Sequence, residues 1–567
     1  MGKRKKSKRW RKLFLWILFV LILFTGGLFA IGYFYYGSLI RTYLKETVYT
    51  QSKGIYRAEI GEIYLDVLNG NLHVQGLTLT PDLRRYHELA GSDTLFPLIF
   101  GLKIGRIRVN NFEIQRYLRE HVIDIKSIRF SSPEVVIYRM KSSSHVRELK
   151  SRERMFDLNL PPAIAGLFIG EILLENGKLT FRDHSGDSLK IYHIPSCNIR
   201  ITGVNVRPGI HSKHLYNSDD ITVVIRGFEI KTKNGMNWVS FGEIGLSTGK
   251  QEIYVKNFHL TPLFNRHDYC RKLGFQTDRI NVEAGEIKFS RIDLRSLILY
   301  RSLIAEKLSI AKPIIDDYRD KRIPIKPGFR AIMPQEGIRS LKTVLKIDTV
   351  ILNGGKATYS EQVGSEPGTI HFDKMNATLL RLTNDSIQLN SGTITDLHAT
   401  AWLQGNAKLD ARMRFRAGDK KNTFTFSARM GSFDLCGINP MLSKLVPGHV
   451  RCGQIKQMII PDMRANDDVS HGTLLLYYNN LKIQMDVRKP NPWDKIKAGV
   501  INFIANDILV NDDNPTKSGK LNEGVICFTR DKQKGIFNYL WKSAFSGIKS
   551  TVGINNKEQK KKKKSRN

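Results

Sequence analysis

A serine flanked by glycines is the best candidate for a nucleophile in this chain. The segment Gly245-Leu246-Ser247-Thr248-Gly249 has the glycine and serine spacing of an α/β-hydrolase nucleophile elbow. That elbow needs a strand before the serine and a helix after it, because the sharp turn between them presents the hydroxyl. Here the alternating residues Ile253 and Val255 indicate a second strand instead. We therefore predict a hairpin turn at Ser247, without a catalytic role.

The other polar residues occur in no pattern typical of a catalytic or metal site. The groups worth testing are His211 with His214, Asp82 with His87 and Glu88, and the carboxylate pairs Asp467-Asp468 and Asp512-Asp513. Neither carboxylate pair has the spaced oxygen ligands of a calcium loop. We expect all of them in polar loops or turns. The sequence predicts no catalytic, cofactor-binding or metal-binding residue, and a protein that is not an enzyme.

A short glycine-containing motif recurs along the chain and indicates which structural elements surround these polar residues. Ile60-Gly61-Glu62-Ile63 is repeated at 169–172, and near copies stand at 104–107, 241–244 and 284–287. The glutamate is replaced by Arg106 in one copy, so it has no common chemical role. The apolar alternation changes phase beside the glycine, which is typical of a β-bulge or bend. We interpret the glycine as a recurrent strand irregularity.

Longer segments around this motif align with each other at a separation of about 180 residues. Residues 61–81 match 242–262, 102–140 match 282–320, and 167–181 match 345–359, each without a gap. This order indicates a tandem duplication of roughly 60–215 and 241–395. Repeats of this size predict a repetitive, elongated architecture in which each unit packs on its neighbours.

The pattern within the copies is that of β-strands. Apolar residues alternate with polar ones, and Asn69-Gly70, Asn176-Gly177 and Gly354-Gly355 are typical turn signals. Residues 472–487 are expected to form a hairpin that turns at Asn479-Asn480. After Pro490 and Pro492 the period becomes helical. The helical stripe either covers the end of the sheet or lies on a membrane surface.

The N-terminus predicts a membrane anchor. Leu13–Tyr36 carries no charge and is long enough to cross a bilayer, and basic residues precede it. The positive-inside rule then keeps the N-terminus cytoplasmic and places the remaining chain on the other side of the membrane. A cleaved signal peptide is the alternative, but Tyr33–Tyr36 is bulky at the expected cleavage position.

The charge of the chain points to anionic partners. The formal net charge is +36, and the basic residues are spread over the body as well as the ends. Lipid headgroups, an acidic polymer or an acidic outer-membrane partner would suit this charge. A translocated body argues against nucleic acid. The five cysteines form no CxxC pair, so we expect no zinc or redox site, and one disulfide remains possible.

These observations divide the chain into segments. We expect a basic cytoplasmic segment (1–12), a transmembrane helix (13–36), a first β repeat (41–240), a second β repeat (241–395), a C-terminal β segment (396–490), a helical segment (491–556) and a polybasic tail (557–567).

Several segments resemble the AsmA-like family of envelope proteins, in its Bacteroidetes-type branch that carries a domain of unknown function. The likeness rests on Ile60–Asp82 after the anchor, on 102–114 with 125–139, and on 471–485. The resemblance implies a mainly β fold: one transmembrane helix, then a twisted, taco-like β-sheet groove with short helices. It also implies a bacterial protein that is anchored in the inner membrane, has its bulk in the periplasm, and moves or holds phospholipid between the inner and outer membranes on the apolar side of the groove.

The residues that would serve this role follow from the alternation and the helical stripe. The groove candidates are Leu72, Val74, Leu77, Leu79, Ile107, Val109, Leu179, Phe181, Ile253 and Val255. The membrane-surface helix candidates are Ile536, Phe537, Leu540, Trp541, Phe545 and Ile548, with the basic run Lys560–Lys564 just beyond them. The expected function is non-enzymatic binding or conduction of phospholipid in support of the outer membrane. The alternative is an envelope scaffold that binds an anionic polymer or a partner protein.

Overall fold

The fold was obtained as a computed structural model, which describes residues 37–66, 68–89, 98–140, 160, 163–184, 189–208, 217–445, 448–485 and 511–553. The expected anchor Leu13–Tyr36, the pair His211 and His214, and the run Lys560–Lys564 lie outside the described residues. None of the described helices combines the length and the apolar character needed to span a bilayer. The described part is mainly β, with 22 strands in mixed parallel and antiparallel pairing, as expected from the alternation.

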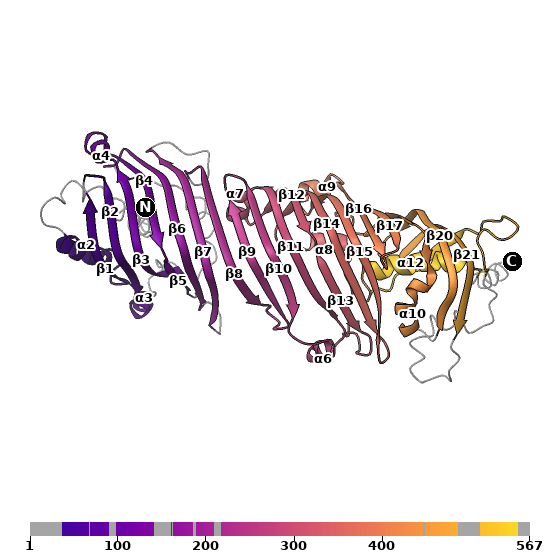
Figure 1. The fold of residues 1–567 in the computed structure, drawn as a ribbon. Coiled ribbons are helices and arrows are strands. Elements are labelled where there is room, and N and C mark those ends of the chain that lie inside the picture. The colour runs from indigo at the N-terminus through magenta and orange to yellow at the C-terminus, as the bar shows by residue number, and fades with distance from the viewer. Residues whose placement is uncertain are drawn as a thin grey trace, which may run out of the picture. The chain divides into compact units, whose positions relative to one another are not determined.

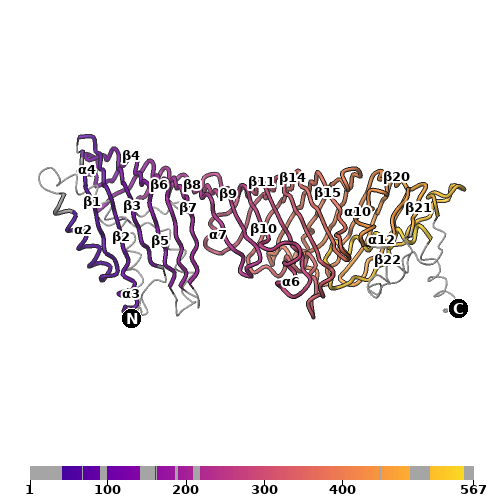
Figure 2. Tube along the Cα trace, turned by 60° about the horizontal axis from the view of Figure 1, so that its bottom comes forward, coloured from indigo at the N-terminus to yellow at the C-terminus, as the bar shows by residue number. Residues whose placement is uncertain are grey.

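The chain divides into two compact units, which are described separately. Unit 1 contains the residues up to Ile230, with Ser240–Val255 and Asp293–Tyr300, and unit 2 contains the rest. In unit 1, neighbouring strands run side by side (Figures 1 and 2). Its elements are α2 (Gly37–Gln51), β1 (Tyr56–Asp66), β2 (Asn71–Pro81), α3 (Leu83–Leu89), β3 (Leu98–Phe112), α4 (Ile114–Glu120), β4 (Val122–Ser131), β5 (Glu134–Arg139), β6 (Gly166–Asp183), β7 (Lys190–Val206) and β8 (Asp220–Lys231), with α7 (Leu294–Tyr300).

Three strands contribute residues to both units: β8, through Lys231, β9 (Asn237–Ser247) and β10 (Glu252–Pro262). Unit 2 continues with many strands and several short helices (Figure 1). They are α6 (Asp268–Leu273), β11 (Asp278–Ile292), β12 (Leu303–Ala311), β13 (Ile314–Asp320), α8 (Pro334–Arg339), β14 (Leu345–Gln362), β15 (Pro367–Thr383), α9 (Ser386–Asn390), β16 (Ile394–Leu403), β17 (Ala407–Arg416), β18 (Phe424–Met430), β19 (Phe433–Asp434), η2 (Leu435–Ile438), α10 (Asn439–Leu445), β20 (Gly448–Ala465), β21 (Val469–Met485), β22 (Gly524–Thr529) and α12 (Ile536–Thr551).

The same order of elements and the same pairing occur twice. In the first copy, β1 to β7, strand β3 pairs with β5 and then β4, and both of these pair parallel with the long strand β6. In the second copy, β9 to β15, β11 pairs with β13 and then β12, and both pair parallel with β14. Each long strand then pairs antiparallel with the next one, β7 or β15. The copies therefore share one internal design.

The glycine of the repeated motif marks a strand irregularity, as expected. Ile60 faces Leu77 and Glu62 faces Gln75, so Gly61 and Gly76 are both skipped in the register. A Cβ added to Gly61 would lie 1.8 Å from the carbonyl oxygen of Gln75, and Gly76 has a φ of +80°. Only glycine fits both positions, because other side chains would clash or strain the backbone. The alternation keeps its apolar side on one face across the slip.

Three expected turns are wrong, and the structure shows continuous strands there. β6 runs through Asn176-Gly177 and β14 through Gly354-Gly355, each with a register shift. β21 runs through Asn479-Asn480, where Asn480 has a φ of +53°. β20 pairs with β21 on both sides of this point, so the ladder continues and the described part of the expected hairpin, 472–485, is a single strand. A left-handed Asn or Gly serves a bulge as well as a turn. Asn69-Gly70 does form the expected turn between β1 and β2.

Each unit has a buried core of its own. In unit 1 the largest cluster of the described side chains comes from β2, β3, β4 and β6 and includes Leu72, Val109 and Ile125. In unit 2 the largest cluster lies between β17 to β22 and the helix α12, and includes Met413, Leu474 and Tyr539. All five cysteines are free.

Candidate functional site

One row of apolar side chains crosses six strands of unit 2. The register joins Phe289 of β11 to Leu308, Val350, Leu379, Leu397 and Met413 of β12, β14, β15, β16 and β17. Side chains on paired positions point to the same side of a sheet, so this apolar row lies on one face. The next positions form a mostly polar row on the other face: Lys288, Ser309, Ile351, Thr378, His398 and Arg412.

The apolar row changes from buried to half-buried along its length. Met413 is buried and Leu397 packs beside the same core cluster. Phe289, Leu308, Val350 and Leu379 are only half-buried, and no buried cluster of the described chain includes them. Apolar side chains that remain partly exposed to water can still gain free energy from apolar contact, since burial contributes about 25 cal/mol per Å². The half-buried part is therefore a candidate binding face.

Four of the expected groove residues lie together inside the unit 1 core. Leu72 faces Val109 and Val74 faces Ile107 across β2 and β3, and these four side chains are between 2% and 5% exposed. Leu77 and Leu79 follow on β2 and are half-buried. The first four belong to a closed core, so they serve the stability of unit 1.

The remaining expected groove residues are half-buried. Leu179 and Phe181 of β6 face Ile194 and Tyr192 of β7, and the Phe181 and Tyr192 rings lie 6.2 Å apart. Ile253 and Val255 of β10 are also half-buried. They remain candidates for ligand contact, whereas the buried four do not.

The expected C-terminal helix is present as α12, and it packs on the sheet through its small residues. Ser543 and Gly547 are buried, and a Cβ added to Gly547 would lie 2.8 Å from Cβ of Leu474. The larger apolar residues of the expected stripe divide between the core side of the helix and its exposed side. Ile536, Leu540 and Ile548 pack beside the unit 2 core, Phe537 is 85% and Trp541 48% exposed, and Phe545 stacks on Trp541 at 5.7 Å. Its role as a membrane-surface helix stays a prediction.

A group of ionisable side chains interrupts the apolar face of β11, β13 and β14. Asp278 faces Arg319, and Ile280 faces Asp317, while Asp317 faces Tyr359, and Arg319 faces Glu361. Together with Lys321 they form what we call the ionic cluster: Asp278, Asp317, Arg319, Lys321, Tyr359 and Glu361. Phe372 of β15 faces Ala357 of β14, and Ala357 faces Ile315 of β13, so apolar residues of the same face adjoin the cluster.

Hydrogen bonds and ion pairs satisfy most members of the ionic cluster. The Arg319 guanidinium donates two hydrogen bonds of 2.5 Å to the carboxylate of Asp278. Lys321 Nζ lies 2.5 Å from Glu361 Oε1, and the Tyr359 hydroxyl donates to Glu361 Oε2 at 2.8 Å. Asp317 differs, because its Oδ1 is buried without a hydrogen-bond partner in the described chain.

The environment of Asp317 favours its neutral form. Burial and, to a smaller extent, the negative charge of Asp278 raise the pKa of its carboxyl to about 7, against the opposing charge of Arg319. A carboxyl that titrates near neutral pH is often a functional group, although ionic networks of structure also produce such shifts. Among the described residues, no group of His, Cys, Asp and Glu side chains is arranged to hold a metal ion.

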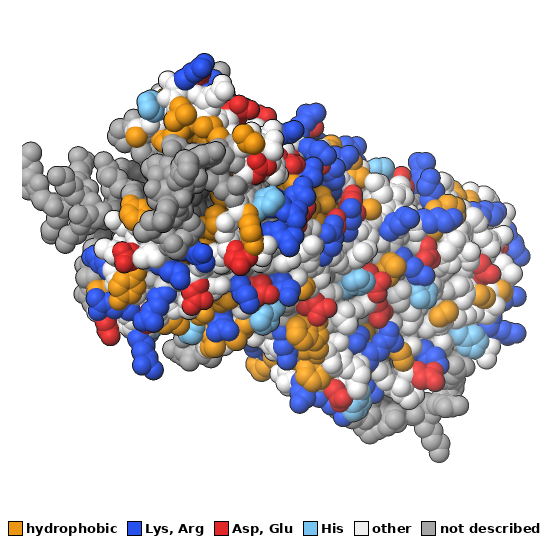
Figure 3. All heavy atoms as spheres, turned by 60° about the vertical axis from the view of Figure 1, so that its left-hand side comes forward, with side chains coloured by type: hydrophobic (Ala, Val, Ile, Leu, Met, Phe, Trp, Pro, Cys, Tyr) orange, Lys and Arg blue, Asp and Glu red, His pale blue; other side chains and the backbone are white. Residues whose placement is uncertain are grey.

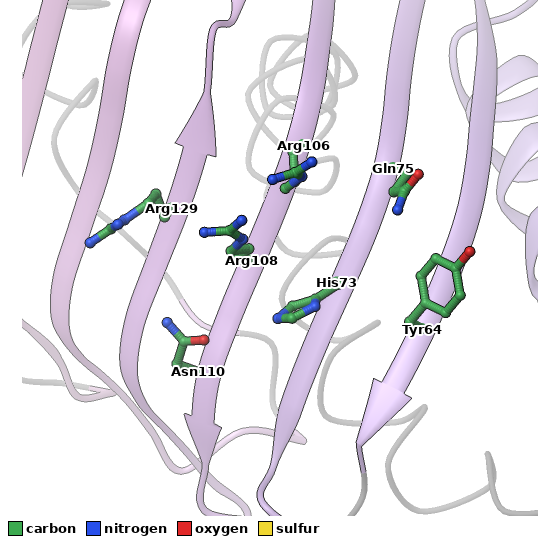
Figure 4. Close-up of a pocket in the computed structure, with 7 residues that line it drawn as sticks. All are labelled: Tyr64, His73, Gln75, Arg106, Arg108, Asn110 and Arg129. Carbon is green, nitrogen blue, oxygen red and sulfur yellow. The ribbon is translucent and has the colours of Figure 1, made fainter.

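A second candidate site lies on the polar face of unit 1. A shallow hollow of about 400 Å³ is lined by side chains of β1 to β4 (Figure 4): Tyr64, His73, Gln75, Arg106, Arg108, Asn110 and Arg129. Arg108 faces His73 on one side and Arg129 on the other. Arg129 lies 3.8 Å from Glu175, and no ion pair of Arg106 or Arg108 is found in the described chain. We call this surface the arginine hollow.

The basic character extends beyond this hollow. Figure 3 shows a side of the molecule on which Lys and Arg side chains are more frequent than Asp and Glu. This agrees with the net charge of +36. Such a surface attracts anionic partners over a distance of about 10 Å at moderate salt.

The residues first considered for catalysis have structural roles in the described chain. Ser247 ends β9 and donates a hydrogen bond of 2.9 Å to Asp220 Oδ1, and β10 follows the turn, so the hairpin prediction is confirmed. Asp82 accepts hydrogen bonds from the backbone N–H groups of Arg84 and Arg85 at the start of α3. Asp467 pairs with the buried Arg530, and Asp513 accepts from the backbone N–H of Asn480.

Sequence reasoning missed the ionic cluster, although the aligned copies contain its signal. At the same positions of the first copy stand Leu98 for Asp278, Ile137 for Asp317 and Phe181 for Tyr359. A polar residue that replaces an apolar one on the inner side of a repeated strand indicates a local function.

The comparisons with known proteins assign no function to the candidate sites. No protein-family model matches the chain, and no curated protein is significantly similar to it. The likeness to the AsmA-like family therefore rests on the quoted segments.

Proposed function

We propose that this protein binds phospholipid, with the acyl chains lying on the half-buried apolar row of β11 to β15. The observation that carries the proposal is the row itself: Phe289, Leu308, Val350 and Leu379 lie on one face of consecutively paired strands and are only half-buried. An acyl chain is long, apolar and flexible, so it can cover several strands at once and remove their side chains from water.

The repeated design supports an extended binding face. Both copies keep apolar residues on one face across glycine bulges, and in the second copy that face is not filled by a core cluster of the described chain. The predicted anchor at Leu13–Tyr36 would hold this face at the inner membrane, and the predicted periplasmic location would place it where lipid must pass between membranes. We propose a non-enzymatic role in outer-membrane lipid homeostasis, in an elongated groove as the AsmA-like resemblance implies.

Lipid analysis of matched variants tests this function. The full chain, purified in detergent, is extracted and its phospholipid measured by mass spectrometry. We expect Leu308→Asp to reduce the bound phospholipid about tenfold, since a carboxylate on the apolar row costs several kcal/mol to bury. Ser309→Asp places the same charge on the opposite face and should leave the amount unchanged. Equal phospholipid in both variants, or none in the unmodified chain, would reject the proposal.

A second candidate function is an envelope scaffold that binds an anionic polymer, and the arginine hollow favours it. Arg106, Arg108 and Arg129 stand on adjacent strands, where their guanidinium groups can donate paired hydrogen bonds to phosphate or carboxylate. Polyphosphate serves as the probe. We expect Arg108→Gln to weaken its binding several-fold, and Arg200→Gln, whose guanidinium is paired with Glu171, to have little effect. Equal loss in the two variants would mean that net charge alone attracts the polymer.

A further inference from the structure

Two free cysteines of unit 2 lie beside each other where the pairing of β19 with β20 ends. The last pair of this antiparallel ladder joins Asp434 to Gln454. Two residues further, the antiparallel order places Cys436 opposite Cys452. Both cysteines are free and half-buried, so a thiol reagent in solution has access to them.

Contacts on either side of Cys436 show that the chain keeps to this path, although η2 begins at Leu435. A Cβ added to Gly453 would lie 3.0 Å from Cδ1 of Leu435. Asn439 Nδ2 donates a hydrogen bond of 2.8 Å to the Val450 carbonyl oxygen, and the Val450 N–H donates one of 2.9 Å to Asn439 Oδ1. These contacts hold η2 beside the first half of β20.

The Cys436 thiol points to the peptide unit that precedes Cys452. Its Sγ lies 3.4 Å from the carbonyl oxygen of Arg451. In a trans peptide this oxygen is about 3 Å from the next Cα, so the Cys436 sulfur lies within roughly 6 Å of Cα of Cys452. Disulfides join residues whose Cα atoms are about 4.4–6.8 Å apart, and opposite residues of antiparallel segments are about 4.5–5.5 Å apart. The backbones are therefore close enough for a disulfide.

Only side-chain rotation is needed to bring the two sulfur atoms together. The Cys452 thiol donates to the carbonyl oxygen of Asn480 on β21 at 3.3 Å. A thiol is a weak hydrogen-bond donor, so rotation about the Cα–Cβ bond of Cys452 gives up little.

The other cysteines lie on other segments. Cys270 is buried in α6, and the cysteine of β7 belongs to unit 1, where its strand pairs with β6 and β8. Cys527 of β22 faces His471 of β21, whereas Cys452 faces Lys482 of the same strand. The stretch of β21 between these two partners is roughly 35 Å long at about 3.3 Å per residue. Cys527 is therefore too far along the sheet to reach Cys452.

We propose that Cys436 and Cys452 form an intramolecular disulfide that fastens η2 and α10 to β20. The two thiols together lose two protons and two electrons as the sulfur–sulfur bond forms, and an oxidant of the disulfide class accepts them and becomes two thiols. One thiolate attacks the oxidant, and the second thiolate then displaces the mixed disulfide. An oxidising compartment supplies such an oxidant, and the predicted periplasmic location of the body fits this requirement.

The bond fixes a helix that contacts two strands. α10 packs against β15 as well as β20 (Figure 1), and a Cβ added to Gly368 of β15 would lie 2.6 Å from the carbonyl oxygen of Met441. Lys444 of α10 also forms an ion pair with Glu366. A disulfide closes the loop 436–452 in the unfolded chain and lowers its conformational entropy, so it stabilises the folded form of this part of unit 2.

Oxidation of the purified full chain with oxidised glutathione tests the bond. The folded protein is oxidised, the reaction is stopped with acid, and the remaining thiols are labelled with N-ethylmaleimide. Trypsin cleaves after Lys444 and Arg451, which separates the two cysteines into the peptides 430–444 and 452–456. We expect mass spectrometry to find these two peptides linked in most molecules. Two maleimide-labelled peptides, or two peptides that each carry glutathione, would overturn the proposal.

Matched variants separate this bond from general oxidation. Cys436→Ser should abolish the linked peptides, whereas Cys527→Ser removes an exposed cysteine of the same unit and should keep them. The oxidised chain should melt roughly 5 °C above the reduced chain, because the closed loop restricts the unfolded state. The Cys436→Ser variant should melt at the same temperature under both conditions. Linked peptides without a rise in the melting temperature would reject the fastening role.

Discussion

The two copies of the repeat place different chemistry at the same positions of the same strands. In the first copy, Ile137 of β5 lies between Phe100 of β3 and Phe181 of β6. In the second copy, Asp317 of β13 lies between Ile280 of β11 and Tyr359 of β14. The backbone pairing is unchanged, so the repeat supplies a frame and the side chains decide what each part does.

The two copies also differ in how deeply their apolar side chains are buried. Val74 and Ile107 of the first copy belong to a buried cluster, whereas Ile287 and Phe289 of β11 in the second copy are half-buried. A closed face contributes to folding, and a half-open face with charged groups at its end is available to a ligand. Variants at matched positions can test this difference.

A carboxylate introduced at Val74 or at the aligned Val255 should change the free energy of unfolding most, and by unequal amounts. Val74 is 5% exposed, so Val74→Asp is expected to lower the free energy of unfolding by about 3–5 kcal/mol, because a buried carboxylate without a partner is strongly unfavourable. Val255 aligns with it and is half-buried, and Val255→Asp should cost about 1 kcal/mol. Urea denaturation followed by circular dichroism measures both. Equal costs would remove the distinction between a closed and a half-open face.

Removal of Arg319 or of its counterpart Arg139 should have the next largest effect on the free energy of unfolding. In the second copy, the side chains of Arg319 and Asp278 are 23% and 28% exposed, and Arg319→Ala leaves the carboxylate half-buried without its partner. We expect a loss of about 2–3 kcal/mol of unfolding free energy. Arg139 is the matched residue of the first copy, 53% exposed and 3.7 Å from Asp183, and Arg139→Ala should cost less than about 1 kcal/mol. A larger loss at Arg139 would contradict the special character of the ionic cluster.

The pH dependence of stability should show a smaller effect of Asp317. Its folded-state pKa of about 7 is above the ordinary value of 3.8, so between these values the folded state holds a proton that the unfolded state releases. Stability from this group is therefore full below about pH 4 and falls as the pH rises through 7. Asp317→Asn should reduce the difference in unfolding free energy between pH 5 and pH 8 by about 1–2 kcal/mol, since partial exposure weakens the shift. An unchanged pH dependence would show that Asp317 is ionised in the folded protein.

Alternation and the repeat made the β fold predictable, but turns and bulges could not be separated. Asn69-Gly70 and Asn176-Gly177 have the same residue types, yet the first forms a turn and the second continues β6 with a register shift. Both structures need a residue that tolerates a left-handed or crowded backbone. The choice depends on whether a partner strand continues past the point, and a single sequence segment does not contain that information.

The degree of burial could not be read from the alternation either. Val74 and Leu308 both occupy apolar positions of alternating strands, but one is in a core and the other is half-buried. Burial depends on what packs over the face, such as α12 with its small residues Ser543 and Gly547. The helix itself was predictable from its period. Its buried side was not, because small residues such as Ser543 and Gly547 are buried there beside Tyr539, whereas Phe537 and Trp541 are exposed.

Photocrosslinking at two neighbouring positions of β14 tests lipid binding most directly. A benzophenone amino acid is placed at Val350 of the apolar row or at Thr349, which lies on the opposite face of the same strand. The full chain is exposed to membranes that contain radiolabelled phospholipid and irradiated. We expect a labelled adduct at position 350 and none at 349. Equal labelling at the two positions, or none at 350 in folded protein, would contradict the account.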